Sequence, residues 1–523
     1  MLIIRNGKVF DGAGNPWFKA DICVDEGRIT AVGNLGGAQA SRVIDVQGLA
    51  VCPGFIDIHC HSDFSLIATP TMDSKVHQGV TTELNGNCGN SPAPIIGPMI
   101  ELLRARIERL GLKSIWSTTK QYFDTLEKQG HATNTATLLG YNNVRVPVMG
   151  TESREPNDQE LSVMKALVAQ GMENGLFGLS TGLWYPPSTF ATTEELIELC
   201  KVVAEYGGLY VTHIRSESKF FVEAIEEAIR IGEESGASVE CVHHKAFGKP
   251  YWPKVQVTLG LIEKARERGV DVTLDVYPYI RDSGGFAGWL PTWALAGGSE
   301  ELVKRLKDPE ARERIKSQID EQIEEPRDLL STSILTTMHK HPELSGKSLA
   351  ELAKARNVDI IDCAIDLLIE EEGKGLGISQ QFGSEENVKM VLRHPASMVG
   401  SDGSGYTADV KEWVHPRNFG THARLIGKYV REEGVLTLQE AIRKCTSMPA
   451  QRLGLKDRGL IREGMWADIA VFDYAKIHDN FSLTNPAQYA EGVEYVLVNG
   501  QLVLDEGRHT GNLPGRVLRR GQS

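Results

Sequence analysis

Eight short apolar runs, most of them followed by a helical pattern, constrain what the middle of this chain can fold into. They occupy residues 55–59, 80–84, 136–139, 177–180, 209–213, 239–243, 272–276 and 398–401. One helical pattern is clear at 219–234, where apolar residues recur at the spacing of one helix face. Eight strands that alternate with helices predict an α/β fold, a (β/α)8 barrel, whose active site lies at the carboxyl ends of the strands.

Both ends of the chain carry short β-rich runs separated by turn signals such as Asn-Gly. They lie at 2–4, 22–24, 29–32 and 43–46, and again at 468–472, 493–498 and 502–504. Isolated hairpins are only marginally stable, so these strands are expected to pair with one another. We therefore predict a small β-sandwich or β-barrel domain from residues 1–52 and 456–523, with the catalytic barrel at 53–455 between them.

The longest interval between predicted strands lies at 277–397. It contains a Gly-rich segment at 282–288 and a charged helical pattern at 300–325. Insertions of this length in a compact domain are usually functional or form separate subdomains. Residues 284–346 are therefore predicted to form a lid over the site, and a surface insertion without a function is the alternative.

Charge and cysteine content argue against several classes of protein. Of the 523 residues, 41% are hydrophobic and 24% are charged, as in ordinary globular proteins. The net charge of -13 argues against nucleic acid or an anionic membrane as a partner, although it is compatible with an anionic substrate. The chain shows no apolar run of about 18 residues and no signal-peptide layout. Its eight cysteines are scattered without a CxxC motif, which favours reduced thiols in a cytoplasmic enzyme.

The first predicted barrel strand ends in two histidines. In Pro53-Gly-Phe-Ile-Asp-Ile-His-Cys-His61, the side chains of His59 and His61 leave the strand on the same side because they are two residues apart. Two imidazoles at a strand end are suited to hold Zn²⁺, but a catalytic zinc needs further ligands. A short His-x-His motif also occurs where histidines simply end a strand, so the rest of the chain must decide.

Two further strands end in a histidine. His213 and His243 each share the parity of the apolar residues that precede them in the strand, whereas alternation sends His244 to the opposite face. A single histidine in such a place is more often a satisfied core residue. Several histidines at strand ends favour a metal site, so we predict His213 and His243 as ligands and leave His244 a structural role.

A cysteine and an aspartate follow two other strands. Cys88 lies just past the second strand, between Gly86 and Gly89. A thiolate is a strong zinc ligand, but buried free cysteines are common, so both interpretations stay open on chemistry alone. Asp402 follows the eighth strand, where a carboxylate is suited to act as general base and then acid beside a metal-activated water. The alternative is an ordinary Asp-Gly turn.

Several motifs occur in a defined order along the chain. They are Pro53-Gly-Phe-Ile-Asp-x-His-x-His61, Gly79-Val-Thr-Thr82, Gly86-Asn-Cys-Gly89, Thr212-His-Ile-Arg-Ser-Glu217, Val242-His-His-Lys245, Asp275-Val-Tyr-Pro-Tyr279, Gly400-Ser-Asp402 and His415-Pro-Arg417. This set resembles the D-aminoacylases, the N-acyl-D-amino-acid deacylase branch of the amidohydrolase superfamily. The matches run from about residue 2 to residue 510. The resemblance implies a metal-bearing (β/α)8 barrel with a small β-domain built from both ends of the chain.

The resemblance also implies roles for individual residues. A tightly bound Zn²⁺ would be held by Cys88 and His213, and a second, weaker metal by His59, His61 and His243. The catalytic general base and acid would be Asp402. The substrate carboxylate and the scissile carbonyl would be met by Lys245, Tyr277, Ser283 and Arg417, of which the arginine offers a planar fork for a carboxylate. Cys60 departs from the small polar residue usual at its position, and parity directs it away from the metal.

The expected reaction is zinc-dependent hydrolysis of the amide bond of a small molecule, an N-acyl-D-amino acid. A cyclic-amide hydrolase, such as a hydantoinase or dihydroorotase, is the first alternative. Such enzymes usually carry a carboxylated lysine after the fourth strand, and residues 176–184 contain no lysine. A catalytically silent structural relative is the second alternative. The preference for D-substrates is implied by the resemblance alone, and the acyl group, side chain, metal count and oligomeric state are not fixed by the sequence.

Overall fold

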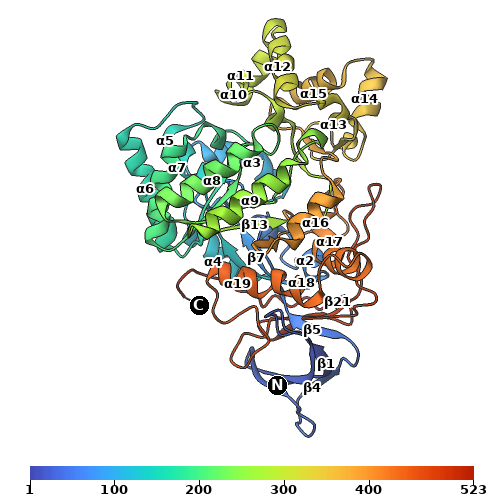
Figure 1. The fold of residues 1–523 in the computed structure, drawn as a ribbon. Helices are drawn as coiled ribbons and strands as arrows, with labels where there is room; N and C mark the ends of the chain where they lie inside the picture. Colours follow the sequence, from blue (N-terminus) through green and yellow to red (C-terminus); the bar gives the residue numbers. More distant parts are fainter. Residues whose placement is uncertain (523) are drawn as a thin grey trace.

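A ring of parallel strands forms the centre of the computed structural model, which describes residues 1–522 (Figure 1). Strands β6-β7-β8 form one sheet, and β9-β10-β11-β12-β13-β17 form another. The sheets adjoin at Leu138, between β8 and β9, whose backbone N–H donates to the carbonyl oxygen of Asn85 at 2.9 Å. Each of the eight predicted strands has a counterpart among β6 (Phe55–Asp57), β7 (Val80–Asn85), β8 (Asn134–Thr137), β9 (Leu139–Gly140), β10 (Gly178–Gly182), β11 (Leu209–His213), β12 (Ser238–Cys241), β13 (Val272–Val276) and β17 (Ser397–Val399).

The ring closes between β6 and β17, its first and last strands. The backbone N–H of Asp402 donates to the carbonyl oxygen of His59 at 2.7 Å. Beside this contact the fully buried ammonium of Lys75 donates to the carboxylate of Asp57 and to the hydroxyl of Ser401, both at 2.7 Å. A charge buried this deeply is tolerated only when it is paired and hydrogen-bonded, so the network fixes how the two strands meet.

The helices that follow the strands pack around the ring. In α8 (Phe221–Ser235) the buried side chains Phe221, Ile225 and Ile229 recur every four residues, which is the spacing of one helix face. The helix ends at Gly236, whose φ of +76° lies in the left-handed region that glycine adopts without strain. The other helices outside the inserted unit are α1 (Ser65–Ala68), α2 (Asp73–Val76), α3 (Met99–Arg109), α4 (Thr119–Gln129), α5 (Tyr141–Met149), α6 (Asp158–Glu173), α7 (Thr193–Glu205), α9 (Lys254–Glu267), α16 (Glu385–Arg393), α17 (Arg417–Arg424), α18 (Leu438–Cys445) and α19 (Ser447–Leu453).

Strands from both ends of the chain form a nine-stranded sheet, as the sequence predicts, with the order β21-β20-β19-β18-β5-β1-β2-β3 and β4 beside β1. The two ends meet where β5 pairs antiparallel with β18, with the buried Val51 opposite the buried Val471. The limits 1–52 and 456–523 for a separate domain stay a prediction. The strands are β1 (Leu2–Val9), β2 (Phe18–Asp25), β3 (Arg28–Gly33), β4 (Arg42–Asp45), β5 (Ala50–Pro53), β18 (Ile469–Phe472), β19 (Val493–Val498), β20 (Gln501–Asp505) and β21 (Arg508–His509).

An inserted helical unit lies at the top of Figure 1, at the opposite end of the molecule from the nine-stranded sheet. Its hydrophobic core runs from Phe286 to Phe382 and joins Phe247, Tyr277 and Tyr279 of the barrel. The unit extends beyond the predicted limit at residue 346 because β16 pairs with both β14 and β15. An amphipathic helix pattern does not reveal which core the helix joins, so the sequence did not show this. The elements are β14 (Gly284–Gly285), α10 (Thr292–Leu295), α11 (Gly298–Lys307), α12 (Pro309–Gln322), α13 (Pro326–Ser331), β15 (Ile334–Leu335), α14 (Leu349–Arg356), α15 (Ile360–Glu370) and β16 (Gly377–Ser379). Its role as a lid stays a prediction.

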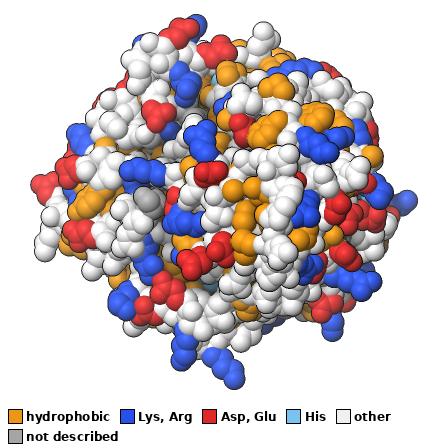
Figure 2. Space-filling view, turned by 90° about the horizontal axis from the view of Figure 1, so that it is seen from below, with side chains coloured by type: hydrophobic (Ala, Val, Ile, Leu, Met, Phe, Trp, Pro, Cys, Tyr) orange, Lys and Arg blue, Asp and Glu red, His pale blue; other side chains and the backbone are white. Residues whose placement is uncertain are grey.

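The surface carries charges of both signs. Figure 2, seen from below the view of Figure 1, shows Lys and Arg side chains interspersed with Asp and Glu. Some of them pair, as Arg42 does with Asp505 at 2.6 Å. Among residues 1–522, none of the helices combines the length and apolar character needed to cross a membrane.

Folding buries the ring of His422 in α17, and neither ring nitrogen has a hydrogen-bond partner among the described residues. Its ring stacks on Phe55 with the centroids 5.5 Å apart. Burial lowers the pKa of His422 to about 4, whereas a histidine in an unfolded chain has a pKa of about 6.5. As the pH falls, the unfolded chain therefore takes up a proton first. Stability conferred by this residue is lost as the pH falls from about 6.5 towards 4.

We expect His422→Phe to reduce the loss of stability on acidification. Between pH 7 and pH 5 the wild-type protein should lose about 2 kcal/mol of unfolding free energy through this residue, and the variant should not. Thermal unfolding midpoints at the two pH values measure the difference, with the more exposed His341→Phe as control. An equal drop in midpoint for wild type and His422→Phe would contradict the interpretation.

Candidate metal centre

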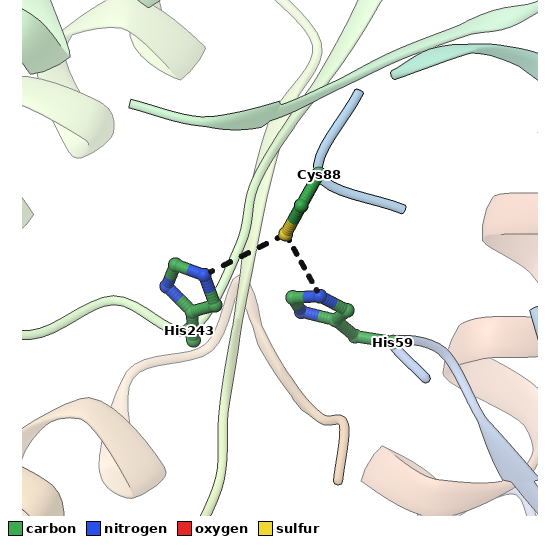
Figure 3. Close-up of side chains that lie close together, drawn as sticks. All are labelled: His59, Cys88 and His243. Carbon is green, nitrogen blue, oxygen red and sulfur yellow. Dashed lines mark hydrogen bonds between the residues drawn. The ribbon is translucent and has the colours of Figure 1, made fainter. Parts of the chain in front are cut away.

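Three of the five predicted ligands lie around the sulfur atom of a fourth, Cys88. Sγ of Cys88 lies 3.6 Å from Nε2 of His59, 3.9 Å from Nδ1 of His213 and 4.0 Å from Nε2 of His243. Figure 3 shows this sulfur between the rings of His59 and His243. Nδ1 of His213 and Nε2 of His243 are 3.0 Å apart. Because the four residues end or follow β6, β7, β11 and β12, the cluster lies at the carboxyl ends of the barrel strands.

A tight turn after β7 places Cys88 in the cluster. Cys88 has a φ of +52°, and its neighbours Gly86 and Gly89 have φ of +79° and +80°, all in the left-handed region. A Cβ on Gly86 would lie 2.3 Å from the carbonyl oxygen of Leu138, and one on Gly89 would lie 2.9 Å from the backbone nitrogen of Gly182. Neither glycine leaves room for a side chain. The Gly-Asn-Cys-Gly motif is therefore required by the backbone as well as by the thiol.

The donors around Cys88 fit Zn²⁺. Thiolate sulfur and imidazole nitrogen are its usual donors, and in a tetrahedral site they lie about 3.5 Å from one another. The sulfur–nitrogen distances of 3.6 to 4.0 Å are close to that separation. Burial raises the pKa of Cys88, but hydrogen bonds from the surrounding histidines outweigh it and lower the pKa well below its usual value. The sulfur is therefore a thiolate, the form that binds metal.

Asp402 reaches the cluster from the loop after β17. One of its oxygens lies 3.1 Å from Nε2 of His61 and 3.6 Å from Nε2 of His59, so these three residues form a second group with metal-binding geometry. The other oxygen lies 2.7 Å from Nη1 of Arg417. Burial raises the pKa of Asp402, but Arg417 and the histidines lower it well below its usual value. The carboxylate is therefore ionised, and it is held between His59 and His61 on one side and Arg417 on the other.

Two carboxylates outside the predicted set orient the histidines. Oδ1 of Asp275 accepts the backbone N–H of His243 at 2.8 Å and lies 3.3 Å from Nδ1 of His59. Oε1 of Glu217 lies 3.0 Å from Nδ1 of His243 and accepts the ammonium of Lys245 at 2.7 Å. A carboxylate on the outer ring nitrogen fixes the tautomer and direction of a metal-binding histidine. His59 and His243 are both held in this way, with Nε2 towards the sulfur.

Sequence signals for these carboxylates differ. Asp275 lies within the predicted strand 272–276, in the motif Asp275-Val-Tyr-Pro-Tyr279, so its place near a strand end is a signal that could have identified it. Glu217 lies in a loop four residues after His213, where no periodicity directs a side chain. Only its presence in the motif Thr212-His-Ile-Arg-Ser-Glu217 pointed to it.

A cavity of about 230 Å³ opens beside the cluster. It is bordered by the metal-binding and catalytic candidates His61, Cys88, His213, His243 and Asp402. The predicted substrate-binding residues also line it, namely Lys245, Tyr277, Ser283 and Arg417. The remaining wall includes side chains that the sequence did not indicate: Trp184, Tyr185, Phe247, Asp282, Trp289 and Gln380.

Two neighbours of the ligands lie outside the cluster. Nε2 of His244 is 2.9 Å from Oγ1 of Thr258, in the layer between β12 and α9. Sγ of Cys60 donates to the carbonyl oxygen of Leu84 at 3.1 Å. Both side chains are therefore held outside the cluster by partners of their own.

Replacement of Cys88 by alanine should remove the central donor. We expect Cys88→Ala to bind zinc more weakly by at least about tenfold, because a lost ligand costs more than a lost outer hydrogen bond. Metal analysis and chelator competition on the purified protein measure this. Cys200→Ala, a buried thiol of α7, is the matched control. Full zinc retention in Cys88→Ala would show that the thiolate is not a ligand.

Comparisons with known proteins agree with this architecture. The model of the amidohydrolase family matches residues 42–324 and 344–504. An N-acyl-D-glutamate deacylase from Alcaligenes xylosoxydans xylosoxydans is 35% identical over 523 residues, which cover 100% of this chain and 97% of the relative.

Two solved structures each cover 99% of this chain and 99% of their own. One is an N-acyl-D-glutamate deacylase from Bordetella bronchiseptica in complex with zinc and a phosphonate mimic of the tetrahedral intermediate, with a TM-score of 0.83 and 32% identity. The other is a D-aminoacylase with a binuclear metal centre, described by one-metal activation and second-metal attenuation, with a TM-score of 0.84 and 33% identity. The predicted barrel with an added β-domain is therefore confirmed. The chain belongs to the amidohydrolase family.

Proposed function

We propose that this protein is a zinc-dependent deacylase of N-acyl-D-amino acids. The observation that carries the proposal is the Cys88 thiolate among three histidines, with an ionised Asp402 beside it at the mouth of the cavity. The relatives described as N-acyl-D-glutamate deacylase and D-aminoacylase support the same reaction class. The products are a carboxylate and a free D-amino acid.

The metal would be held at two positions. Cys88 and His213 would bind the first ion tightly, and His59, His61 and His243 would form the weaker second position. The zinc in one similar structure and the binuclear centre in another support a zinc site with two positions. When bound, Zn²⁺ supplies a Lewis acid that polarises a carbonyl oxygen and lowers the pKa of water.

Asp402 is suited to move the proton in this reaction. Because Arg417 and the histidines keep its carboxylate ionised, it is able to accept a proton from the attacking water. The same oxygen then delivers the proton to the departing amide nitrogen. Its contact with His61 at 3.1 Å holds the carboxylate against the cluster throughout.

The substrate carboxylate would be bound by Lys245, Tyr277, Ser283 and Arg417. The buried hydroxyl of Tyr277 and Nε of Arg417 have no hydrogen-bond partner among the described residues. Burial raises the pKa of Tyr277 well above its usual value, so the hydroxyl remains a donor. The guanidinium of Arg417 lies over the Tyr277 ring, 4.9 Å from its centre. Two unused donors thus belong to residues that line the same cavity, and a carboxylate is suited to accept from them.

The alternatives differ in their substrate and metal content. A cyclic-amide hydrolase would need a lysine after the fourth strand, where β10 instead carries Ser180, whose hydroxyl donates to the carbonyl oxygen of Gly86. A silent relative would bind no zinc. A panel of N-acetyl-D-amino acids, their L-enantiomers, hydantoin and dihydrouracil distinguishes these functions. Hydrolysis of the cyclic amides alone, or zinc-free folded protein, would contradict the proposal.

A cytoplasmic location is proposed on the state of the thiols. All eight cysteines are free, as is usual in a reducing compartment. We propose no nucleic-acid or membrane partner, on the strength of the net charge of -13. The oligomeric state is left open.

The acid–base role of Asp402 predicts the effect of removing its charge. Asp402→Asn should reduce kcat on N-acetyl-D-amino acids by about 10²-fold or more, since the proton then has no acceptor. Zinc content, measured in parallel, should remain within a factor of two of wild type for the tight position. A zinc-loaded Asp402→Asn protein with most of its turnover would contradict the role.

The contact of Glu217 with His243 and Lys245 predicts a positioning role. Glu217→Gln removes the charge that both nitrogens face, so kcat/KM should fall by about 10- to 100-fold. The exposed Glu226→Gln on α8 is the control. Kinetics unchanged in Glu217→Gln would show that the carboxylate only fills space.

A further inference from the structure

One carboxylate in the cavity has no part in the proposed reaction. Asp282 lies between β13 and β14, directly before Ser283, and lines the cavity. One of its oxygens accepts the backbone N–H of Gln380 at 3.0 Å, and the other lies 3.4 Å from the side-chain nitrogen of the same residue. The inserted unit therefore holds this carboxylate in the cavity wall.

The two cations of the cavity are bound to other partners. The ammonium of Lys245 donates to Glu217 at 2.7 Å. The guanidinium of Arg417 lies 2.7 Å from the carboxylate of Asp402. When a substrate binds, these same cations are the ones that would receive its α-carboxylate. Neither makes an ion pair with Asp282, although the charges of both lower its pKa from a distance.

The neighbouring Arg281 makes no ion pair with Asp282 either, although burial lowers the pKa of Arg281 and the charge of Asp282 opposes this. Its guanidinium donates to the carbonyl oxygens of Ser379 at 2.6 Å and Thr332 at 3.1 Å. Among the described side chains, no Lys, Arg or His nitrogen lies within 4.0 Å of the Asp282 carboxylate. Burial raises the pKa of Asp282 to about 6, so the group is largely ionised at neutral pH. The cavity wall thus carries a negative charge whose direct partners are the backbone and side-chain amides of Gln380.

The cavity wall also includes neutral aromatic side chains. Trp184, Tyr185 and Trp289 line the cavity with Asp282. Tyr185 is close to the segment, since a Cβ on Gly284 would lie 2.9 Å from its hydroxyl. Burial raises the pKa of Tyr185 well above its usual value, so it stays neutral. A second carboxylate on the substrate would meet this wall with no unpaired cation to receive it.

We propose that Asp282 sets the charge selectivity of the cavity, so that the protein acts on N-acyl-D-amino acids with neutral or cationic side chains and rejects acidic ones. The inference rests on the proposed function and narrows its substrate class. The substrate class proposed here differs from that of the relatives described as N-acyl-D-glutamate deacylases. Like charges forced together in a cavity with little water discriminate strongly between substrates of similar shape.

The test compares two substrates of nearly equal shape. We expect wild-type protein to hydrolyse N-acetyl-D-glutamine with a kcat/KM at least about tenfold above that for N-acetyl-D-glutamate at pH 7.5. Asp282→Asn keeps the size of the residue and an oxygen that accepts the Gln380 N–H. In this variant kcat/KM for the glutamine derivative, divided by that for the glutamate derivative, should fall severalfold. The kcat/KM for N-acetyl-D-lysine, divided by that for the glutamine derivative, should fall as well. Lost packing alone would not favour the negatively charged substrate and disfavour the positively charged one, each relative to the glutamine derivative.

Controls separate the possible failures. Asp124→Asn, on the exposed face of α4, removes a carboxylate far from the cavity and should leave both ratios unchanged. Zinc content and the thermal midpoint verify that Asp282→Asn is folded. Hydrolysis of glutamate and glutamine derivatives at equal rates, or ratios unchanged in Asp282→Asn, would overturn the selectivity while leaving the deacylase function in place. No hydrolysis of any acyl-D-amino acid would instead contradict the proposed function, and the inference with it.

Discussion

The metal centre depends on the contact that closes the strand ring between β6 and β17. Lys75 lies fully buried between Asp57 and Ser401, two residues separated by 344 positions in the chain. In a medium of low polarity the stabilisation from such a network decreases steeply when the charges move apart, so little displacement is tolerated. His59 and Asp402 each lie within two residues of it. The distance between the predicted ligand His59 and the proton-transfer group Asp402 is therefore set by the charges buried beneath the site.

A chain of alternating charges extends this order into the cavity. Arg417 faces Asp402, Asp402 faces His61, and the histidines face the Cys88 thiolate. Burial lowers the pKa of His61, but Asp402 and Cys88 raise it to about 9. Groups that neutralise one another in pairs are already oriented before substrate enters, so little reorganisation accompanies the reaction. Because these groups are already paired, the charge of a substrate side chain affects binding chiefly at the cavity wall that contains Asp282.

Much of this site was predictable from the sequence, for reasons that differ between residues. The alternation of side chains along a strand identified His213, which lies within β11. It also separated His243 from His244, although β12 ends at Cys241 and His243 has a φ of +35°. Cys88 lies in a turn, where no periodicity applies, and only its flanking glycines and the motif indicated it. Asp282 carried no usable signal, and Glu217 was marked only by its place in a motif. The directions of both side chains are fixed by contacts with Gln380 and Lys245. The extent of the inserted unit was hidden because a strand of three residues, β16, decides it.

The nine-stranded sheet has a consequence for biosynthesis. Strand β5 can find its partner β18 only after more than four hundred further residues have left the ribosome. Until then β5 offers an apolar edge with unpaired backbone groups, which is a surface prone to aggregation. Contacts between residues so far apart in sequence also form slowly. Synthesis of this protein therefore includes a waiting period in which the first fifty residues need shielding, and a chain arrested before β18 would keep that edge exposed.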